Sequence, residues 1–111
     1  MSSRLGVPGR AGRKPARAIK PHADKAAALL KALANEQRLL ILCNLLEGPL
    51  AVGELNEKVS LSQSALSQHL GVLRDANVVT TQREAQSIRY ALSSGAVTRI
   101  IEILYQEFCE T

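Results

Sequence analysis

Apolar side chains recur at helical spacing in four successive segments of the chain. Positions i, i+3, i+4 and i+7 lie on one side of a helix, so each segment can bury a single apolar stripe. Asn35 and Ser62 precede two of the segments and are suitable N-caps, and Gly48 and Pro49 interrupt the pattern between them. The predicted helices cover residues 23–34, 36–47, 51–59 and 63–76, and the second places Leu39, Leu42, Cys43 and Leu46 on its apolar face.

After the fourth helix the pattern changes to β-type alternation. Asn77 can end that helix as a C-cap, and two β-rich runs at 79–83 and 88–92 flank a polar turn. Apolar positions then return at helical spacing over residues 94–109. A short turn between the third and fourth helices makes a helix-turn-helix, and a hairpin directly after it makes a wing. The sequence therefore predicts a mainly α fold with a small β-hairpin wing, an α+β winged helix-turn-helix.

The exposed face of the fourth helix is polar but uncharged. It carries serine and glutamine in place of the lysine and glutamate that normally solubilise a surface helix. Glutamine can pair with an adenine edge, serine with several bases, and phosphate oxygens accept hydrogen bonds from both. The residues predicted to contact double-stranded operator DNA are Ser62, Gln63, Ser64, Ser67, Gln68 and His69 of this helix and Arg83 and Gln86 of the wing. For His69, a role in helix packing stays open as an alternative. For Arg83 and the nearby Arg89, the alternative is a side chain that contacts only water.

The net charge of +4 is divided unevenly along the chain. Six of the 14 Lys and Arg side chains and none of the 10 acidic ones lie in residues 1–20, so the remainder is slightly acidic. An acidic body does not attract DNA in bulk, so affinity would depend on local groups and on the basic segment. Gly, Pro, Ser and Arg dominate residues 1–21, which are expected to form a disordered tail before a folded domain of residues 22–111.

Several classes of protein are not expected. No apolar stretch approaches the roughly 18 residues that span a bilayer, and the basic tail lacks the apolar core of a secretory signal, so a cytoplasmic protein with no membrane partner is expected. The sequence contains no P-loop, no Ser/His/Asp set and no paired catalytic carboxylates, so neither an enzyme nor a cofactor is expected. The apolar first and last helices offer more surface than one domain of about 90 residues covers, which predicts a homodimer reading a pseudo-palindromic operator.

The two cysteines, Cys43 and Cys109, form no C-x-x-C motif and no Cys/His cluster. A structural disulfide is not expected in a reducing cytosol. Cys109 follows a helix C-terminus and stands beside Glu107 and Glu110, which favours the neutral thiol. Residue chemistry alone leaves two hypotheses for the role of the cysteines: they are small side chains that pack in the core, or they form a redox-active dithiol.

Several motifs occur in an order that resembles the ArsR/SmtB family of bacterial winged-helix repressors. They are L-L-K-A-L-A-N-E-Q-R-L-L-I-L-C at 29–43, V-G-E-L at 52–55, L-S-Q-S-A-L-S-Q-H-L-x-V-L-R at 61–74 and R-Y-A-L at 89–92. The resemblance covers about residues 23–110. It implies a dimer of winged helices that binds operator DNA and leaves it when an inducer is sensed.

The position of the cysteines bears on the inducer. Metal-sensing members carry thiols on the helix before the recognition helix, where this chain has Glu54, Leu55, Asn56 and Glu57, or Asp and His ligands on the last helix, which has neither. One cysteine on the second helix and one at the end of the last resembles the dithiol branch of the family, the BigR, SqrR and HlyU type. The resemblance implies that persulfide or polysulfide converts Cys43 and Cys109 into a disulfide or polysulfide bridge and relieves repression.

Three alternatives remain at this point. A metal-responsive repressor could use a site without a familiar motif. A redox-insensitive winged-helix regulator could keep its cysteines for packing. Outside DNA binding, the fold could serve as a protein-interaction module or the dithiol as a small oxidoreductase, although no C-x-x-C motif supports the latter.

Overall fold

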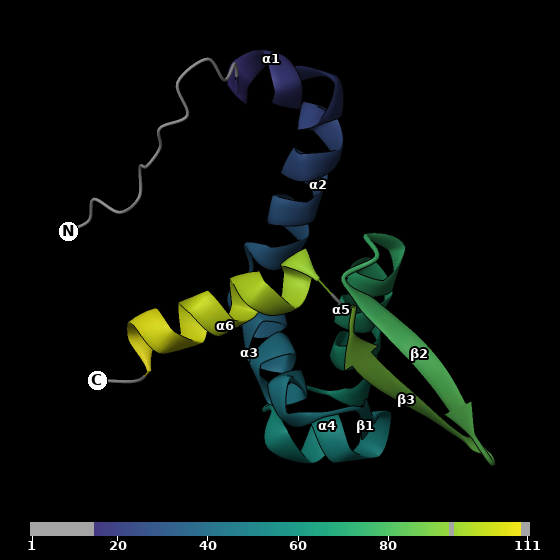
Figure 1. The fold of residues 1–111 in the computed structure, drawn as a ribbon. Helices are drawn as coiled ribbons and strands as arrows, with labels where there is room; N and C mark the ends of the chain where they lie inside the picture. Colours follow the sequence, from purple (N-terminus) through teal and green to yellow (C-terminus); the bar gives the residue numbers. More distant parts are fainter. Residues whose placement is uncertain (1–14, 94, 110–111) are drawn as a thin grey trace.

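The computed structural model describes residues 15–93 and 95–109 and arranges them as a winged helix-turn-helix (Figure 1). The mainly α fold with a β-hairpin wing is therefore confirmed. The elements are α1 (Pro15–Ile19), the 3-10 turn η2 (Lys20–His22), α2 (Ala23–Leu33), α3 (Glu36–Asn44), the 3-10 turn η3 (Leu45–Glu47), β1 (Leu50–Ala51), α4 (Val52–Lys58), α5 (Gln63–Asp75), β2 (Val79–Glu84), β3 (Ser87–Leu92) and α6 (Ala96–Phe108).

Local capping signals determine where α3 and α5 begin. The Asn35 side chain accepts a hydrogen bond from the backbone N–H of Arg38 at 3.0 Å. The Ser62 hydroxyl accepts one from the backbone N–H of Ala65 at 3.1 Å. Each bond satisfies a backbone donor that the first turn of a helix leaves without a partner. Both predicted N-caps are thus confirmed.

The predicted helix ends differ from the structure by a few residues. The α form of the second helix ends at Asn44 and its last turn is the 3-10 turn η3. The C-cap of α5 is Ala76, and Asn77 follows it with a φ of 61°, a left-handed conformation that asparagine tolerates well. Helix α6 begins at Ala96, after Gly95 with a φ of 76°.

A third strand, β1, was not predicted. Leu50 and Ala51 pair antiparallel with Tyr90 and Arg89 of β3, which gives a sheet in the order β1-β3-β2. Two residues are too few to show alternation, so the sequence carries no signal for this strand. Its pairing ties the base of the wing to the segment that leads into α4.

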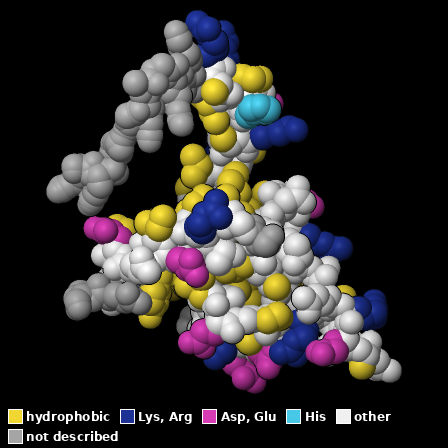
Figure 2. All heavy atoms as spheres, in the orientation of Figure 1, with side chains coloured by type: hydrophobic (Ala, Val, Ile, Leu, Met, Phe, Trp, Pro, Cys, Tyr) yellow, Lys and Arg dark blue, Asp and Glu magenta, His cyan; other side chains and the backbone are white. Residues whose placement is uncertain are grey.

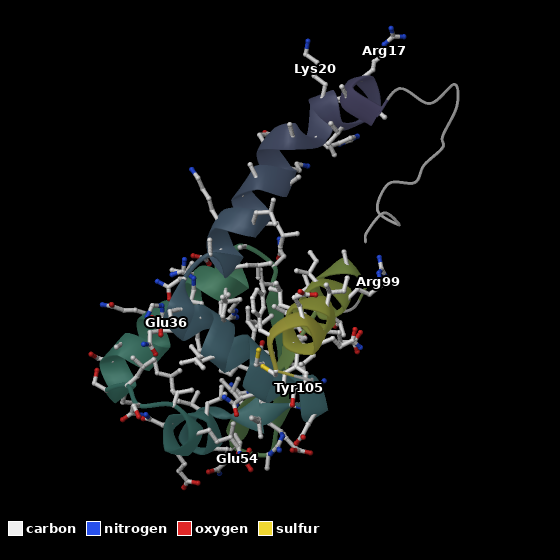
Figure 3. The ribbon with its side chains drawn as sticks, turned by 90° about the vertical axis from the view of Figure 1, so that its left-hand side faces the viewer. Arg17, Lys20, Glu36, Glu54, Arg99 and Tyr105 are labelled. Carbon is white, nitrogen blue, oxygen red and sulfur yellow. The ribbon has the colours of Figure 1, made fainter. Side chains whose placement is uncertain are left out.

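The described part of the basic segment is helical, which differs from the expected disordered tail of residues 1–21. Pro15 begins α1. The first residue of a helix does not use its N–H in an intrahelical hydrogen bond, so proline is tolerated there, and the alanines that follow favour a helix. Every side chain from Ala16 to Ala23 is exposed, and Arg17 and Lys20 extend away from the helical body (Figure 3). These turns therefore belong to no packed core. Residues 1–14 lie outside the described residues.

Helix α3 lies at the centre of the helical body, where it contacts α2, α4, α5 and α6 (Figure 1). Its fully buried side chains are Ile41 and Leu42, followed by Leu45 of η3. The buried stripe is thus rotated from the predicted one, and Cys43 lies at its edge, half-buried. Burial of this kind stabilises the fold by about 1.5–3 kcal/mol for each large side chain. The same rotation leaves the Cys43 thiol partly accessible.

Two helices expose large apolar side chains. Leu30 of α2 is 57% exposed, and Ile103 and Phe108 of α6 are 61% and 77% exposed. Figure 2 shows hydrophobic side chains along α2 and around the neighbouring part of the body. Exposed apolar area of this extent on adjoining helices is typical of a surface that another chain covers.

Candidate DNA-reading face and thiol site

Helix α5 presents its polar residues to solvent and its leucines to the core. Leu66, Leu70 and Leu73 are buried, whereas the predicted DNA-contacting residues Ser62, Gln63, Ser64, Ser67 and Gln68 are all exposed. The turn that leads into α5 is held by Asn56 of α4, whose side-chain amide donates to the carbonyl of Leu61 at 2.9 Å. The helix therefore offers a continuous polar face on a rigid support. Contact between this face and DNA remains a prediction.

His69 faces inward, toward α3. Its Nδ1 lies 3.5 Å from Nη1 of Arg38, and the residue is only partly exposed. Arg38 also donates from Nε to the carbonyl of Ala32 at 2.7 Å and from Nη2 to the carbonyl of Lys31 at 3.3 Å. This position favours the packing role for His69 that the sequence left open. It also makes Arg38 a link between the end of α2, helix α3 and the recognition helix.

Replacing Arg38 by alanine is expected to lower the free energy of unfolding by about 1–3 kcal/mol, because two backbone carbonyls lose a charged donor. Urea unfolding followed by circular dichroism measures the change. Arg99→Ala is the matched control, since the side chain of Arg99 is exposed on α6 (Figure 3). Equal stability of the two variants would show that the Arg38 contacts contribute nothing.

The wing residues divide into solvent-facing and internally bonded groups. Arg83 and Gln86 are exposed, as a role in DNA contact requires. Arg89 instead forms ion pairs with Glu54 at 3.4 Å and Glu84 at 3.6 Å, and it donates to the carbonyl of Pro49 at 3.3 Å. Arg89 therefore fastens the wing to the start of α4, a role that sequence reasoning missed.

The two cysteines, far apart in the sequence, lie on or next to two helices that pack together, α3 and α6. Both are free thiols; Cys43 is half-buried near the end of α3, and Cys109 is exposed directly after α6. Burial raises the pKa of the Cys43 thiol above its usual value, and the negative charge of a Cys109 thiolate raises that pKa further. Cys109 is therefore near enough to affect the ionisation of Cys43, and no cation among the described residues lowers the pKa of Cys43.

Replacing Cys109 by serine is expected to lower the pKa of Cys43, because the smaller of the two causes of its elevation disappears. The remaining desolvation keeps the pKa above the ordinary value. Thiolate is the reactive form, so the Cys109→Ser variant should be alkylated faster below its pKa than Cys43 in the wild type. The rate of iodoacetamide labelling at Cys43, followed by peptide mass spectrometry from pH 7 to 10, measures the shift. An unchanged profile would mean that the thiols do not interact.

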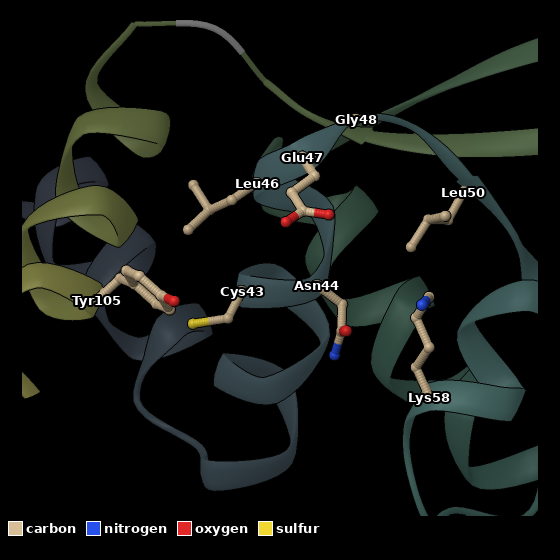
Figure 4. A pocket seen from close by; sticks show the side chains of 8 residues that line it. All are labelled: Cys43, Asn44, Leu46, Glu47, Gly48, Leu50, Lys58 and Tyr105. Carbon is tan, nitrogen blue, oxygen red and sulfur yellow. The ribbon is translucent and has the colours of Figure 1, made fainter. Parts of the chain in front are cut away.

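A cavity of about 440 Å³ opens beside Cys43 (Figure 4). Five elements (α3, η3, β1, α4 and α6) and the segment between η3 and β1 contribute its lining, which is Cys43, Asn44, Leu46, Glu47, Gly48, Leu50, Lys58 and Tyr105. Tyr105 of α6 and Cys43 of α3 extend toward each other at one side, and the charged ends of Glu47 and Lys58 reach in elsewhere (Figure 4). Sequence reasoning did not find this set, because its members come from separate elements without a common motif.

The described ranges 15–93 and 95–109 contain no group of three or more His, Cys, Asp or Glu side chains arranged to hold a metal ion. Nor does any helix in them have the length and apolar character needed to cross a membrane.

Comparison with known proteins identifies the family to which the chain belongs. Residues 35–81 match the family described as bacterial regulatory protein, arsR family. Transcriptional activator HlyU of Vibrio cholerae is 51% identical over 92 residues, which cover 83% of this chain and 85% of the relative. The structure of reduced HlyU from Vibrio cholerae N16961 superimposes with a TM-score of 0.78 at 50% identity, covering 84% of this chain and 98% of that one.

Two further relatives extend the comparison. The biofilm growth-associated repressor of Agrobacterium fabrum is 46% identical over 98 residues, covering 88% of this chain and 84% of the relative. A homodimeric winged helix-turn-helix DNA-binding domain from Mycobacterium bovis, described as a possible ArsR-family regulator, gives a TM-score of 0.71 at 29% identity and covers 85% of each chain. The chain therefore belongs to the arsR family of bacterial regulatory proteins and is a DNA-binding regulator of transcription, not an enzyme.

Proposed function

We propose that the protein is a homodimeric transcriptional repressor that leaves its operator when reactive sulfur species bridge Cys43 and Cys109. The observation that carries this proposal is the packing of α6, which Cys109 directly follows, on α3, which carries Cys43, in a family of DNA-binding regulators. The inducer is a persulfide or polysulfide, which delivers sulfane sulfur to a thiolate.

The operator is contacted by the polar face of α5 and by the tip of the wing. Ser64, Ser67 and Gln68 are exposed on the same helix whose opposite side is buried, as entry into a major groove requires. Arg83 and Gln86 of the wing reach phosphate or the minor groove. The exposed turns that carry Arg17 and Lys20 add positive charge, which helps an otherwise slightly acidic body approach DNA.

The dimer forms through α2 and α6. Leu30, Ile103 and Phe108 are exposed in the single chain, and burying them in a symmetric interface removes their apolar surface from water. The homodimeric Mycobacterium bovis relative supports this arrangement. A two-fold axis then presents two α5 helices to half-sites about one turn of DNA apart.

The sensing step is a pair of thiol exchanges. With an organic trisulfide, the Cys43 thiolate attacks the central sulfur and expels one carrier thiolate; the Cys109 thiolate attacks the same sulfur and expels the second. Two cysteine thiols and one trisulfide thus give a three-sulfur bridge and two carrier thiols, which take up the two protons. With a persulfide, the Cys43 thiolate attacks the outer sulfur, the S–S bond breaks and the carrier leaves as its thiolate. Attack by Cys109 on the Cys43 sulfur then releases hydrosulfide and leaves a disulfide.

Coupling to DNA runs through α3. This helix carries both Cys43 and Arg38, and Arg38 contacts His69 of the recognition helix. A bridge that draws the end of α6 toward α3 shifts α3 relative to α5 and changes the spacing of the two recognition helices. Because the proposed sensing site, the thiol pair, is separate from the DNA-binding helix α5, regulation requires a structural element that couples the two.

A gel shift on the protein's own promoter region tests the proposal. Reduced, peroxide-treated and glutathione-trisulfide-treated protein are compared, with intact mass spectrometry of each sample. The expected result is that trisulfide adds one sulfur with loss of two hydrogens and releases the DNA. Full operator binding by protein shown to carry the bridge would overturn the sensing mechanism, as would a failure to gain sulfur.

The raised pKa of Cys43 favours a second candidate function, a redox-insensitive repressor whose cysteines only pack. A thiol kept neutral is a slow nucleophile. For such a protein, treated and untreated samples bind the operator equally.

A further inference from the structure

Two charged side chains, one positive and one negative, line the cavity beside Cys43. The ammonium of Lys58 comes from the last turn of α4, and the carboxylate of Glu47 comes from η3 (Figure 4). Both side chains are exposed, and the ion pairs formed within the described part of the chain all belong to Arg89. The charges of Lys58 and Glu47 are therefore available to a ligand, and they do not neutralise each other in a direct pair.

The other wall groups suit a small polar molecule with a short apolar portion. One N–H of the Asn44 side-chain amide donates to the carbonyl of Leu40, which leaves its second N–H and its oxygen for a ligand. Tyr105 supplies a hydroxyl beside Cys43, and Leu46 and Leu50 supply apolar surface. The volume of about 440 Å³ falls within the range of about 300–1,000 Å³ usual for small-molecule sites.

We propose that this cavity binds the carrier of the sulfur donor, a zwitterionic thiol derivative of the amino-acid or small-peptide type, with Lys58 holding a carboxylate and Glu47 an ammonium group. The inference rests on the proposed function and names its substrate class and two specificity-determining residues. Inorganic polysulfide, which is only anionic, is attracted by Lys58 but repelled by Glu47, and it leaves most of the cavity unused. A neutral carrier gains from neither charge.

Binding of the carrier explains how a thiol without an activating cation reacts. Burial raises the pKa of Cys43, so little thiolate is present at neutral pH. Holding the sulfur chain against the thiol makes the exchange effectively intramolecular, which offsets the low thiolate fraction. The carrier leaves as a thiolate with its own carboxylate still beside Lys58, and the sulfane sulfur stays on Cys43.

The test uses the Cys109→Ser variant, so that only Cys43 reacts and no bridge can form. Its rate of modification is measured by intact mass spectrometry with two donors. Cysteine trisulfide carries one ammonium and one carboxylate on each half, and bis(2-hydroxyethyl) trisulfide is neutral. Lys58→Gln and Glu47→Gln in this background are expected to slow the reaction with cysteine trisulfide by about three- to fivefold. The neutral donor should react at the same rate in all three proteins.

Lys25→Gln is the matched control, since Lys25 is an exposed lysine of α2 outside the cavity lining. It should alter neither rate. Equal slowing of both donors by Lys58→Gln would overturn the inference, because a general effect on the thiol does not depend on the carrier. No slowing of either donor would also overturn it. Failure of the proposed function has a different result: carrier selectivity persists at Cys43, while bridged wild-type protein still binds its operator.

Discussion

Cys43→Ser and Cys109→Ser are each expected to leave operator binding by the reduced protein unchanged and to abolish its release by persulfide or trisulfide. Each substitution removes one end of the bridge without touching the exposed face of α5. Allosteric coupling is typically worth about 1–3 kcal/mol, so treated wild-type protein should bind about 5- to 150-fold more weakly, whereas the variants should change less than about twofold. Fluorescence anisotropy titration of a labelled operator measures both states.

Cys43 needs a packing control because it is half-buried at the edge of the α3 stripe. Cys43→Ala keeps an apolar side chain there, and urea unfolding shows whether either replacement destabilises the fold. Loss of operator binding by untreated variants of normal stability would assign the cysteines a structural role. A full response to persulfide in the Cys109→Ser variant would place the sensor elsewhere.

The helices and their starts were predictable because their signals are local. Asn35 and Ser62 cap α3 and α5 through bonds to backbone N–H groups three residues away, a distance that short-range sequence patterns record. Strand β1 was not predictable, since Leu50 and Ala51 become a strand only by pairing with Tyr90 and Arg89. The helical turns before α2 were missed because a basic Gly, Pro and Arg composition outweighed the helix-forming residues near Pro15.

The candidate site divides in the same way. The polar face of α5 follows from helical periodicity, so its exposed residues could be named from the sequence. The orientation of His69 could not, because it depends on Arg38 reaching across from α3. The cavity beside Cys43 was equally hidden, since Lys58, Glu47 and Tyr105 meet only after three elements pack together. Long-range pairing, unlike periodicity, leaves no trace in one sequence.

Removing the side chain of Gln63 or Gln68 is expected to weaken operator binding without changing stability. Both residues are exposed on α5, so alanine there alters no core contact. A glutamine that pairs with a base edge contributes about 1–3 kcal/mol of discrimination, which corresponds to about a 5- to 150-fold loss of affinity for the operator. Anisotropy titrations with the operator and with an unrelated duplex of equal length, at one salt concentration, measure the loss.

The comparison of the two duplexes separates base reading from phosphate contact. A base contact is lost only on the operator, whereas a phosphate contact is lost on both duplexes and lowers the salt dependence of binding. Gln106→Ala is the matched control, because Gln106 is an exposed glutamine of α6 on the side of the fold that carries the thiol site. If Gln63→Ala and Gln68→Ala bind the operator as tightly as this control, α5 does not read bases through its glutamines, and specificity must come from its serines or from the wing.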